Sequence, residues 1–219
     1  VLALRKLTSK LMNNKRGLTP RNRERLRPFN DPQTVEAFLR LPERIRAELQ
    51  QSERAAKPKA LLAQAAAAIA IQQAIPLRIG NLASIELDKH LIERSGAVYL
   101  VFNEEETKNA QPIEAQIPDH TRSILAWYIR EHRPALLNSP TNALFPGEAG
   151  RTKSSGLLGL QMGKVIHRYL GLSMHSHLFR HAGAKIFLDR RPGEYEVVRQ
   201  VLRHRSMQTT TAIYTGAET

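Results

Sequence analysis

The spacing of apolar residues along the chain predicts a mostly helical protein. Asp31-Pro32 is a typical helix start, because an aspartate side chain caps free backbone N–H groups and proline suits the first helical position. Apolar residues then recur at helical spacing, and Pro42 and Pro58 begin two further helices. Alanine dominates Ala60–Ile75. Since small side chains allow close packing, we expect this stretch to be a central buried helix that ends at the next proline.

Three short strands are expected in the middle of the chain. Ala83–Leu87, Ala97–Phe102 and Pro112–Pro118 are β-rich or alternate between apolar and polar residues, and short polar turns separate them. Beyond them the helical pattern returns, with helices expected at Thr121–His132, Ser155–Leu170, His177–Leu188 and Glu194–His204 and in a short last segment up to Tyr214. The predicted fold class is mainly α with a small three-stranded antiparallel sheet.

The charge of the chain indicates a polyanionic partner. There are 33 Lys and Arg residues against 20 Asp and Glu, which gives a net charge of +13 and a pI near 10.5. Nucleic acid is the simplest partner for such a chain. Residues 1–30 alone hold nine basic residues and one acidic residue, Glu24, and are broken by glycine and proline. We interpret residues 1–30 as a basic linker that follows the DNA backbone, or alternatively as a solvated linker without a partner.

Several classes of site are excluded or disfavoured. The chain has no cysteine, so it holds no disulfide and no thiolate zinc site. Its longest apolar run, Ala65–Ile71, is far too short to cross a bilayer. His177 and His181 have the i, i+4 spacing of helical zinc ligands, but Leu178 stands where the zinc motif needs glutamate, and no third ligand is evident. We therefore expect no metal, no cofactor and no membrane partner.

The chemistry-bearing residues suit one reaction, the attack of a tyrosine hydroxyl on a DNA phosphodiester. The planar guanidinium of arginine binds two phosphate oxygens at once, histidine can donate or accept protons, and tyrosine can form a covalent bond to phosphorus. The candidate residues are Arg78, Lys108, His177, Arg180, His204 and Tyr214.

Five short motifs that contain these residues follow one another between residues 74 and 215. They are Ala-Ile-Pro-Leu-Arg-Ile-Gly-Asn-Leu at 74–82, Thr-Lys at 107–108, His-Leu-Phe-Arg-His at 177–181, Leu-Arg-His-Arg-Ser at 202–206 and Thr-Thr-Thr-Ala-Ile-Tyr-Thr at 209–215. In this order the motifs resemble the catalytic domain of the tyrosine recombinases, the phage integrase family, over residues 31–214. The resemblance implies the DNA breaking-rejoining catalytic fold for residues 31–219, with residues 1–30 as the linker and tail end of an upstream DNA-binding domain.

The resemblance also implies a role for each candidate. Arg78 and Arg180 would bind the scissile phosphate, and Tyr214 would attack it to form a 3′-phosphotyrosyl bond. Lys108 would protonate the leaving 5′ oxygen, while His177 and His204 would orient the phosphate and assist proton transfer. The expected function is a metal- and ATP-independent site-specific recombinase or integrase of the bacterial cytoplasm, associated with the nucleoid. Its expected partner is double-stranded DNA, bound by a homo-tetramer on two sites that is monomeric or weakly associated without DNA.

The chain departs from the family pattern at four places, and the departures keep alternatives open. Asn81 stands where the family usually has an acid that helps hold the arginine, and Arg203 replaces a glycine. The interval from His204 to Tyr214 is one residue longer than usual, and only five residues follow Tyr214. A catalytically impaired, integrase-like DNA-binding protein is one alternative. A type IB topoisomerase is another, although that family usually has lysine at the position of His177.

Overall fold

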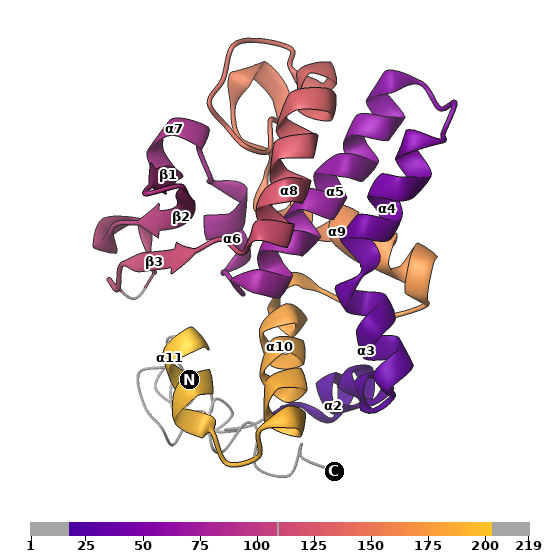
Figure 1. Cartoon of the computed structure of the whole chain (residues 1–219), viewed down its shortest axis with the longest axis vertical. Coiled ribbons are helices and arrows are strands. Elements are labelled where there is room, and N and C mark those ends of the chain that lie inside the picture. The colour runs from indigo at the N-terminus through magenta and orange to yellow at the C-terminus, as the bar shows by residue number, and fades with distance from the viewer. Residues whose placement is uncertain (1–17, 109, 203–219) are drawn as a thin grey trace, which may run out of the picture.

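The described residues form a helical body that carries a small sheet on one side (Figure 1). The computed structural model describes residues 18–108 and 110–202. The helices before the sheet are α2 (Pro20–Leu26), η1 (Arg27–Asn30), α3 (Pro32–Leu39), α4 (Leu41–Gln50), α5 (Ala56–Ala74), α6 (Ile79–Ala83) and α7 (Leu87–His90). The later helices are η2 (Glu104–Glu106), α8 (Asp119–Trp127), η3 (Tyr128–His132), η4 (Arg133–Leu136), η5 (Glu148–Gly150), α9 (Ser155–Leu170), α10 (Ser176–Arg190) and α11 (Tyr195–Leu202). The predicted fold class is confirmed.

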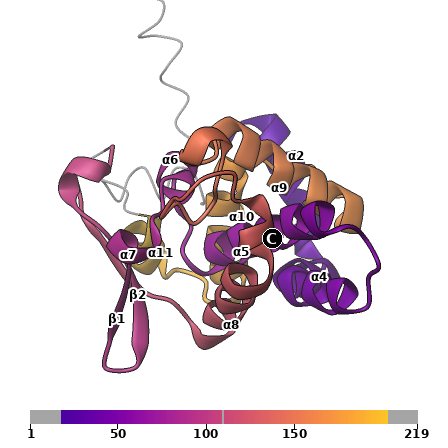
Figure 2. The ribbon, with the colours of Figure 1, turned by 90° about the horizontal axis from the view of Figure 1, so that it is seen from above.

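Helix α5 is the centre of the body, as the alanine-rich sequence predicts. Every residue from 62 to 72 is buried, and the helix packs against α4, α8, α9 and η3. Figure 2 shows α5 between α4, α8 and α9 when the molecule is seen from above. Its alanines allow this close approach from several sides. Despite its length, α5, like every other helix in the described part of the chain, lacks the length or hydrophobicity needed to cross a membrane.

The sheet is antiparallel in the order β1-β2-β3, with β1 at Leu91–Arg94, β2 at Ala97–Phe102 and β3 at Ile113–Gln116. Ser95 and Gly96 connect β1 to β2, and both have positive φ, at 50° and 76°. Two-residue hairpin turns with positive φ at both positions match the twist of the flanking strands. The β1–β2 hairpin projects from the helical body (Figure 2).

The first predicted strand, Ala83–Leu87, is wrong. Ala83 ends α6 and Leu87 begins α7, so Ile85, the apolar residue between them, belongs to a connection between two short helices. Ile85 is fully buried, and its carbonyl accepts a hydrogen bond of 2.8 Å from the backbone N–H of Leu144. A short apolar run that is buried in a loop carries the same sequence pattern as a short buried strand.

Helical structure extends into the segment interpreted as a linker. Residues 20–30 form α2 and η1, and Leu26 and Phe29 are buried in the main core. The Phe29 ring packs edge-on against Phe38 at 5.1 Å between centroids, and Phe38 lies 5.7 Å from Phe179 of α10. This part of the segment therefore packs as part of the helical body. The functional division at residue 30 stays a prediction, and residues 1–17 lie outside the described part of the chain.

Helix α9 approaches the segment before α10 so closely that only glycine fits at one point. A Cβ atom on Gly163 would lie 2.8 Å from the carbonyl oxygen of Met174. We expect Gly163→Ala to lower the free energy of unfolding by about 1–3 kcal/mol, because backbone atoms must move. Gly183→Ala in α10, where a Cβ meets nothing within 4 Å, should instead raise it by about 0.5–1 kcal/mol. Urea unfolding of both variants measures the difference, and equal effects would contradict the close contact at Gly163.

Candidate functional site

The two predicted arginines, far apart in the sequence, line the same cavity. The cavity has a volume of about 310 Å³ and lies between β3, the turn from α5 to α6, α10 and the end of α11. Figure 1 shows α10 and α11 below the sheet, on the side of β3. Arg78 and Arg180 both contribute to the lining, together with Glu114 and Gln116 of β3 and Leu202 of α11.

Arg78 owes its position to the end of α5. Pro76 stops the helix pattern, and Arg78 then caps α6 with an extended backbone, φ −67° and ψ 143°. The side-chain amide of Gln72, which is buried in α5, donates to the carbonyl of Leu77 at 3.1 Å. The backbone just before Arg78 is therefore fixed from the core, while the Arg78 side chain is exposed. Gln72 could not be predicted from the sequence, because glutamine in an alanine-rich helix gives no sign of such a contact.

Arg180 reaches the same turn from α10. Its Nη1 atom donates to the Pro76 carbonyl at 2.6 Å, and its Nη2 atom donates to the carbonyl of Leu202 at the end of α11. The guanidinium is thus held between the turn that leads into Arg78 and the helix that closes the cavity. A planar group with several N–H donors in fixed directions can make such a bridge, and it can bind phosphate in the same way.

His177 lies beside the two arginines in the first turn of α10. His177 is exposed in part, and its partial burial, followed by the charges of Arg180 and Arg78, lowers the pKa of His177 below its usual value of 6.5. The ring is therefore neutral at neutral pH and can both donate and accept a hydrogen bond. The ring of His181, which is buried, packs behind it at 5.1 Å between centroids.

Lys108 is exposed in the turn between η2 and β3 and does not line the cavity. Thr107 closes this turn, since its hydroxyl lies 2.8 Å from the carbonyl oxygen of Gln111 and accepts the Gln111 backbone N–H at 2.9 Å. The structure therefore brings Arg78, Arg180 and His177 together and places Lys108 on a separate, closed turn. His204 and Tyr214, the remaining candidates, lie outside the described residues.

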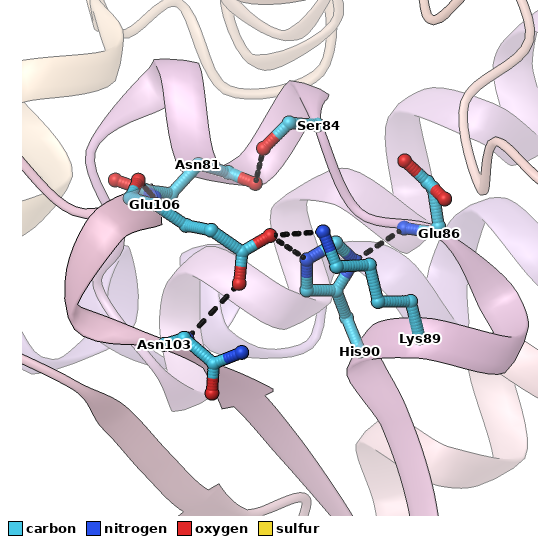
Figure 3. A network of polar contacts seen from close by, with 7 residues as sticks. All are labelled: Asn81, Ser84, Glu86, Lys89, His90, Asn103 and Glu106. Atoms are coloured by element: carbon cyan, nitrogen blue, oxygen red, sulfur yellow. Dashed lines mark hydrogen bonds and ion pairs between the residues drawn. The ribbon is translucent and has the colours of Figure 1, made fainter.

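Glu106 joins this turn to α6 and α7 through a network of polar contacts (Figure 3). Its Oε1 atom accepts from Lys89 at 2.6 Å and from His90 at 3.0 Å, and its Oε2 atom accepts from the backbone N–H of Asn103 at 3.0 Å. The Lys89 contact, with help from Asn103 and His90, lowers the pKa of Glu106 to about 2. Asn81 donates from its amide to the Glu106 carbonyl at 2.9 Å. A carboxylate at position 81 could not make this last contact, because it has no donor.

Within residues 18–108 and 110–202, no group of three or more His, Asp or Glu side chains is placed to hold a metal ion. The paired arginines of the cavity suit a phosphate group, since guanidinium binds its oxygens in a forked, charge-assisted geometry.

The sequence matches the family model described as "Phage integrase family" over residues 43–219. The chain belongs to this family. No curated protein matches the chain in a sequence comparison. Family membership confirms the resemblance that the five motifs indicate, and the match ends where the chain ends.

Solved structures of other integrase-like proteins share the fold. XerH site-specific recombinase bound to a palindromic difH substrate is 19% identical with a TM-score of 0.63, over 86% of this chain and 49% of that one. XerA recombinase is 14% identical with a TM-score of 0.53, over 90% and 57% of the two chains. The Tn1549 transposon integrase in complex with circular intermediate DNA is 15% identical with a TM-score of 0.51, over 83% and 58%. The chain thus has the tyrosine recombinase catalytic fold and spans about half the length of these proteins.

Proposed function

We propose that this chain is the catalytic part of a site-specific DNA recombinase or integrase that cleaves and rejoins duplex DNA through a 3′-phosphotyrosyl intermediate. One observation carries the proposal: Arg78 and Arg180 line one cavity, and partial burial followed by their charges lowers the pKa of His177. Membership of the phage integrase family supports it. The structures of XerH and of the Tn1549 integrase, two proteins of the same fold, contain DNA.

The arginines are proposed to bind the non-bridging oxygens of the scissile phosphate. Negative charge accumulates on these oxygens in the pentavalent transition state, and donors already in position stabilise it without reorganisation. Arg180 now donates to two backbone carbonyls. A phosphate oxygen is an anionic acceptor and hence a stronger partner for guanidinium than a neutral carbonyl. Neutral His177 would contribute one further hydrogen bond to the phosphate.

Tyr214 is proposed as the nucleophile. Its oxygen forms a bond to phosphorus, the bond from phosphorus to the 5′ oxygen breaks, and Lys108 supplies the proton that the 5′ oxygen takes up. His204 would assist removal of the tyrosine proton. The phosphotyrosyl bond retains the energy of the phosphodiester, so a 5′ hydroxyl can reverse the reaction without ATP or metal. These three assignments rest on the motifs alone.

The proposed partner is duplex DNA, in keeping with the net charge of +13. Residues 1–30 would connect the catalytic domain to an upstream DNA-binding domain. Four protomers would assemble on two DNA sites and be monomeric or weakly associated without DNA. The bacterial cytoplasm, at the nucleoid, is the proposed location.

The decisive experiment captures the covalent intermediate. The protein is incubated with a pool of nicked duplexes of randomised sequence, in which the short cleaved product diffuses away and prevents rejoining. Denaturant-resistant adducts are isolated through the protein, and their DNA is sequenced. Mass spectrometry should then find the nucleotide on the tryptic peptide of residues 206–219, which contains Tyr214 as its single tyrosine.

The other outcomes separate the alternatives. Attachment to a different tyrosine would reassign the nucleophile. DNA binding without any adduct would indicate a catalytically impaired DNA-binding protein. If the protein forms the adduct and relaxes supercoiled plasmid but never exchanges strands between two copies of the recovered site, the activity is that of a topoisomerase.

A further inference from the structure

A residue outside the five motifs, Glu106, anchors the turn that carries Lys108. Glu106 lies two residues before Lys108, and both of its carboxylate oxygens are occupied (Figure 3). Oε1 accepts from Lys89 at 2.6 Å and from His90 at 3.0 Å, both of them on α7, and Oε2 accepts from the backbone N–H of Asn103 at 3.0 Å. The donors thus come from α7 on one side and from the end of β2 on the other.

The His90 donor is fixed in orientation. Its Nδ1 atom accepts the backbone N–H of Glu86 at 2.9 Å, so the ring proton is on Nε2, which points at Glu106. The His90 side chain is 2% exposed, and its ring packs against Phe102 of β2 at 4.3 Å between centroids. A buried ring with both nitrogens engaged presents its N–H in one direction only.

The main chain of Glu106 is tied to the helix that begins at Arg78. The amide of Asn81, three residues after Arg78, donates to the Glu106 carbonyl at 2.9 Å and lines the same cavity as Arg78. On its other side, Thr107 bonds across the turn to Gln111. Lys108 follows these two anchored residues directly, so the backbone from which its exposed side chain extends is fixed relative to the cavity.

The geometry points to Glu106 as a positioning residue, which holds the Lys108 turn against α6 and α7 so that the lysine ammonium can reach the 5′ oxygen of the phosphate bound by Arg78. This inference rests on the proposed function, since it concerns the acid of that reaction. All three partners of the carboxylate are donors. Glutamine would therefore place an NH2 group against at least one N–H, although it has the same shape.

The turn itself offers a matched control. Glu105 is exposed and adjacent to Glu106. Glu105→Gln removes the same charge as Glu106→Gln does, from the neighbouring position of the same turn. If the two variants form the adduct at different rates, the difference is therefore due to the anchoring of the turn. It is not due to the loss of a carboxylate that repels phosphate.

The experiment compares two nicked duplexes, both with the sequence recovered from the randomised pool. One has the normal bridging 5′ oxygen at the scissile phosphate and the other has sulfur there. When the bond from phosphorus to sulfur breaks, sulfur leaves as a thiolate and needs no proton, because a thiol is far more acidic than an alcohol. Rates of adduct formation are measured in single turnover for the wild type and for Glu106→Gln, Glu105→Gln and Lys108→Ala.

Glu106→Gln should form the adduct roughly 10- to 100-fold more slowly than the wild type on the oxygen duplex, because the acid is misplaced. On the sulfur duplex its rate should stay within about twofold of the wild type, since no acid is needed. Lys108→Ala should show the same selectivity, and Glu105→Gln should resemble the wild type on both duplexes. Equal losses for Glu106→Gln on both duplexes, or no loss on either, would overturn the inference.

A DNA-free measurement separates this inference from the proposed function. If the wild type forms no adduct with either duplex, the proposed function fails. Amide hydrogen exchange on the full chain then tests the anchor alone. Exchange at the backbone N–H groups of Thr107 and Gln111 should be roughly tenfold faster in Glu106→Gln than in Glu105→Gln, because the charge-assisted contacts are lost. Equal exchange in the two variants would show that Glu106 does not hold the turn.

Discussion

Arg180→Ala should slow covalent adduct formation by about 10²- to 10³-fold, because removing one preorganised hydrogen-bond donor to the developing negative charge typically costs that much. Binding of the same duplex should stay within about fivefold, since the many other basic residues of the chain are expected to contact phosphates and share the affinity. The structure places Arg180 in the lining of the cavity with Arg78, three residues after His177 on α10. Single-turnover cleavage and a gel-shift titration on the same preparation measure the two effects.

Two further variants make this result interpretable. Arg190→Ala removes an exposed arginine from the same helix and should leave cleavage unchanged. Arg180→Lys keeps the positive charge but loses the forked donors, so it should remain strongly impaired. Because Arg180 also holds two backbone carbonyls, the thermal midpoint of each variant should be recorded. A loss of DNA binding as large as the loss of cleavage would show that Arg180 supplies affinity and not transition-state stabilisation.

Tyr214→Phe should abolish the covalent adduct completely, because phenylalanine has no oxygen with which to attack phosphorus. Binding of duplex DNA and thermal stability should match those of the wild type, since one hydroxyl is the only group removed. The adduct is measured on denaturing gels with the duplex recovered from the randomised pool. The effect should exceed that of Arg180→Ala, because a missing nucleophile cannot be compensated by the remaining donors.

Tyr195→Phe is the matched control for this change. Tyr195 begins α11, and its variant should form the adduct at the wild-type rate. An adduct that persists in Tyr214→Phe would place the nucleophile elsewhere. An adduct lost in both variants would point to a shared effect on α11 and the segment that follows it.

The sequence predicts best those elements whose ends are set by residues adjacent to them in the sequence. The predicted helix Ser155–Leu170 has the same limits in the structure. The Ser154 side chain accepts from the Leu157 backbone N–H, and Gly171 ends the helix with φ at 68°. By contrast, the strand predicted at Ala83–Leu87 is absent, and β1 lies instead at Leu91–Arg94. Only the packing of the whole domain distinguishes a buried connection from a buried strand. The local sequence pattern therefore could not predict which of the two forms here.

The same distinction applies to the site. Arg78 and Arg180 could be predicted because each lies within a recognisable sequence motif, and the structure brings both to one cavity. Gln72 and Glu106 lie in no such motif. Their importance comes from contacts with residues that are distant in sequence or on other elements, such as the bond from Asn81 to the Glu106 carbonyl. Such residues can be found only when the fold is known.

The burial of α5 also affects how firmly the position of Arg78 in the cavity is fixed. Every residue from 62 to 72 is buried, so this segment can open to water only when much of the protein unfolds. The turn that leads to Arg78 follows α5 directly, and the Gln72 side chain of α5 donates a hydrogen bond to the Leu77 carbonyl of this turn. Arg78, one of the two arginines proposed to bind the phosphate, therefore follows a fully buried segment, and local opening of the outer helices should hardly move its backbone.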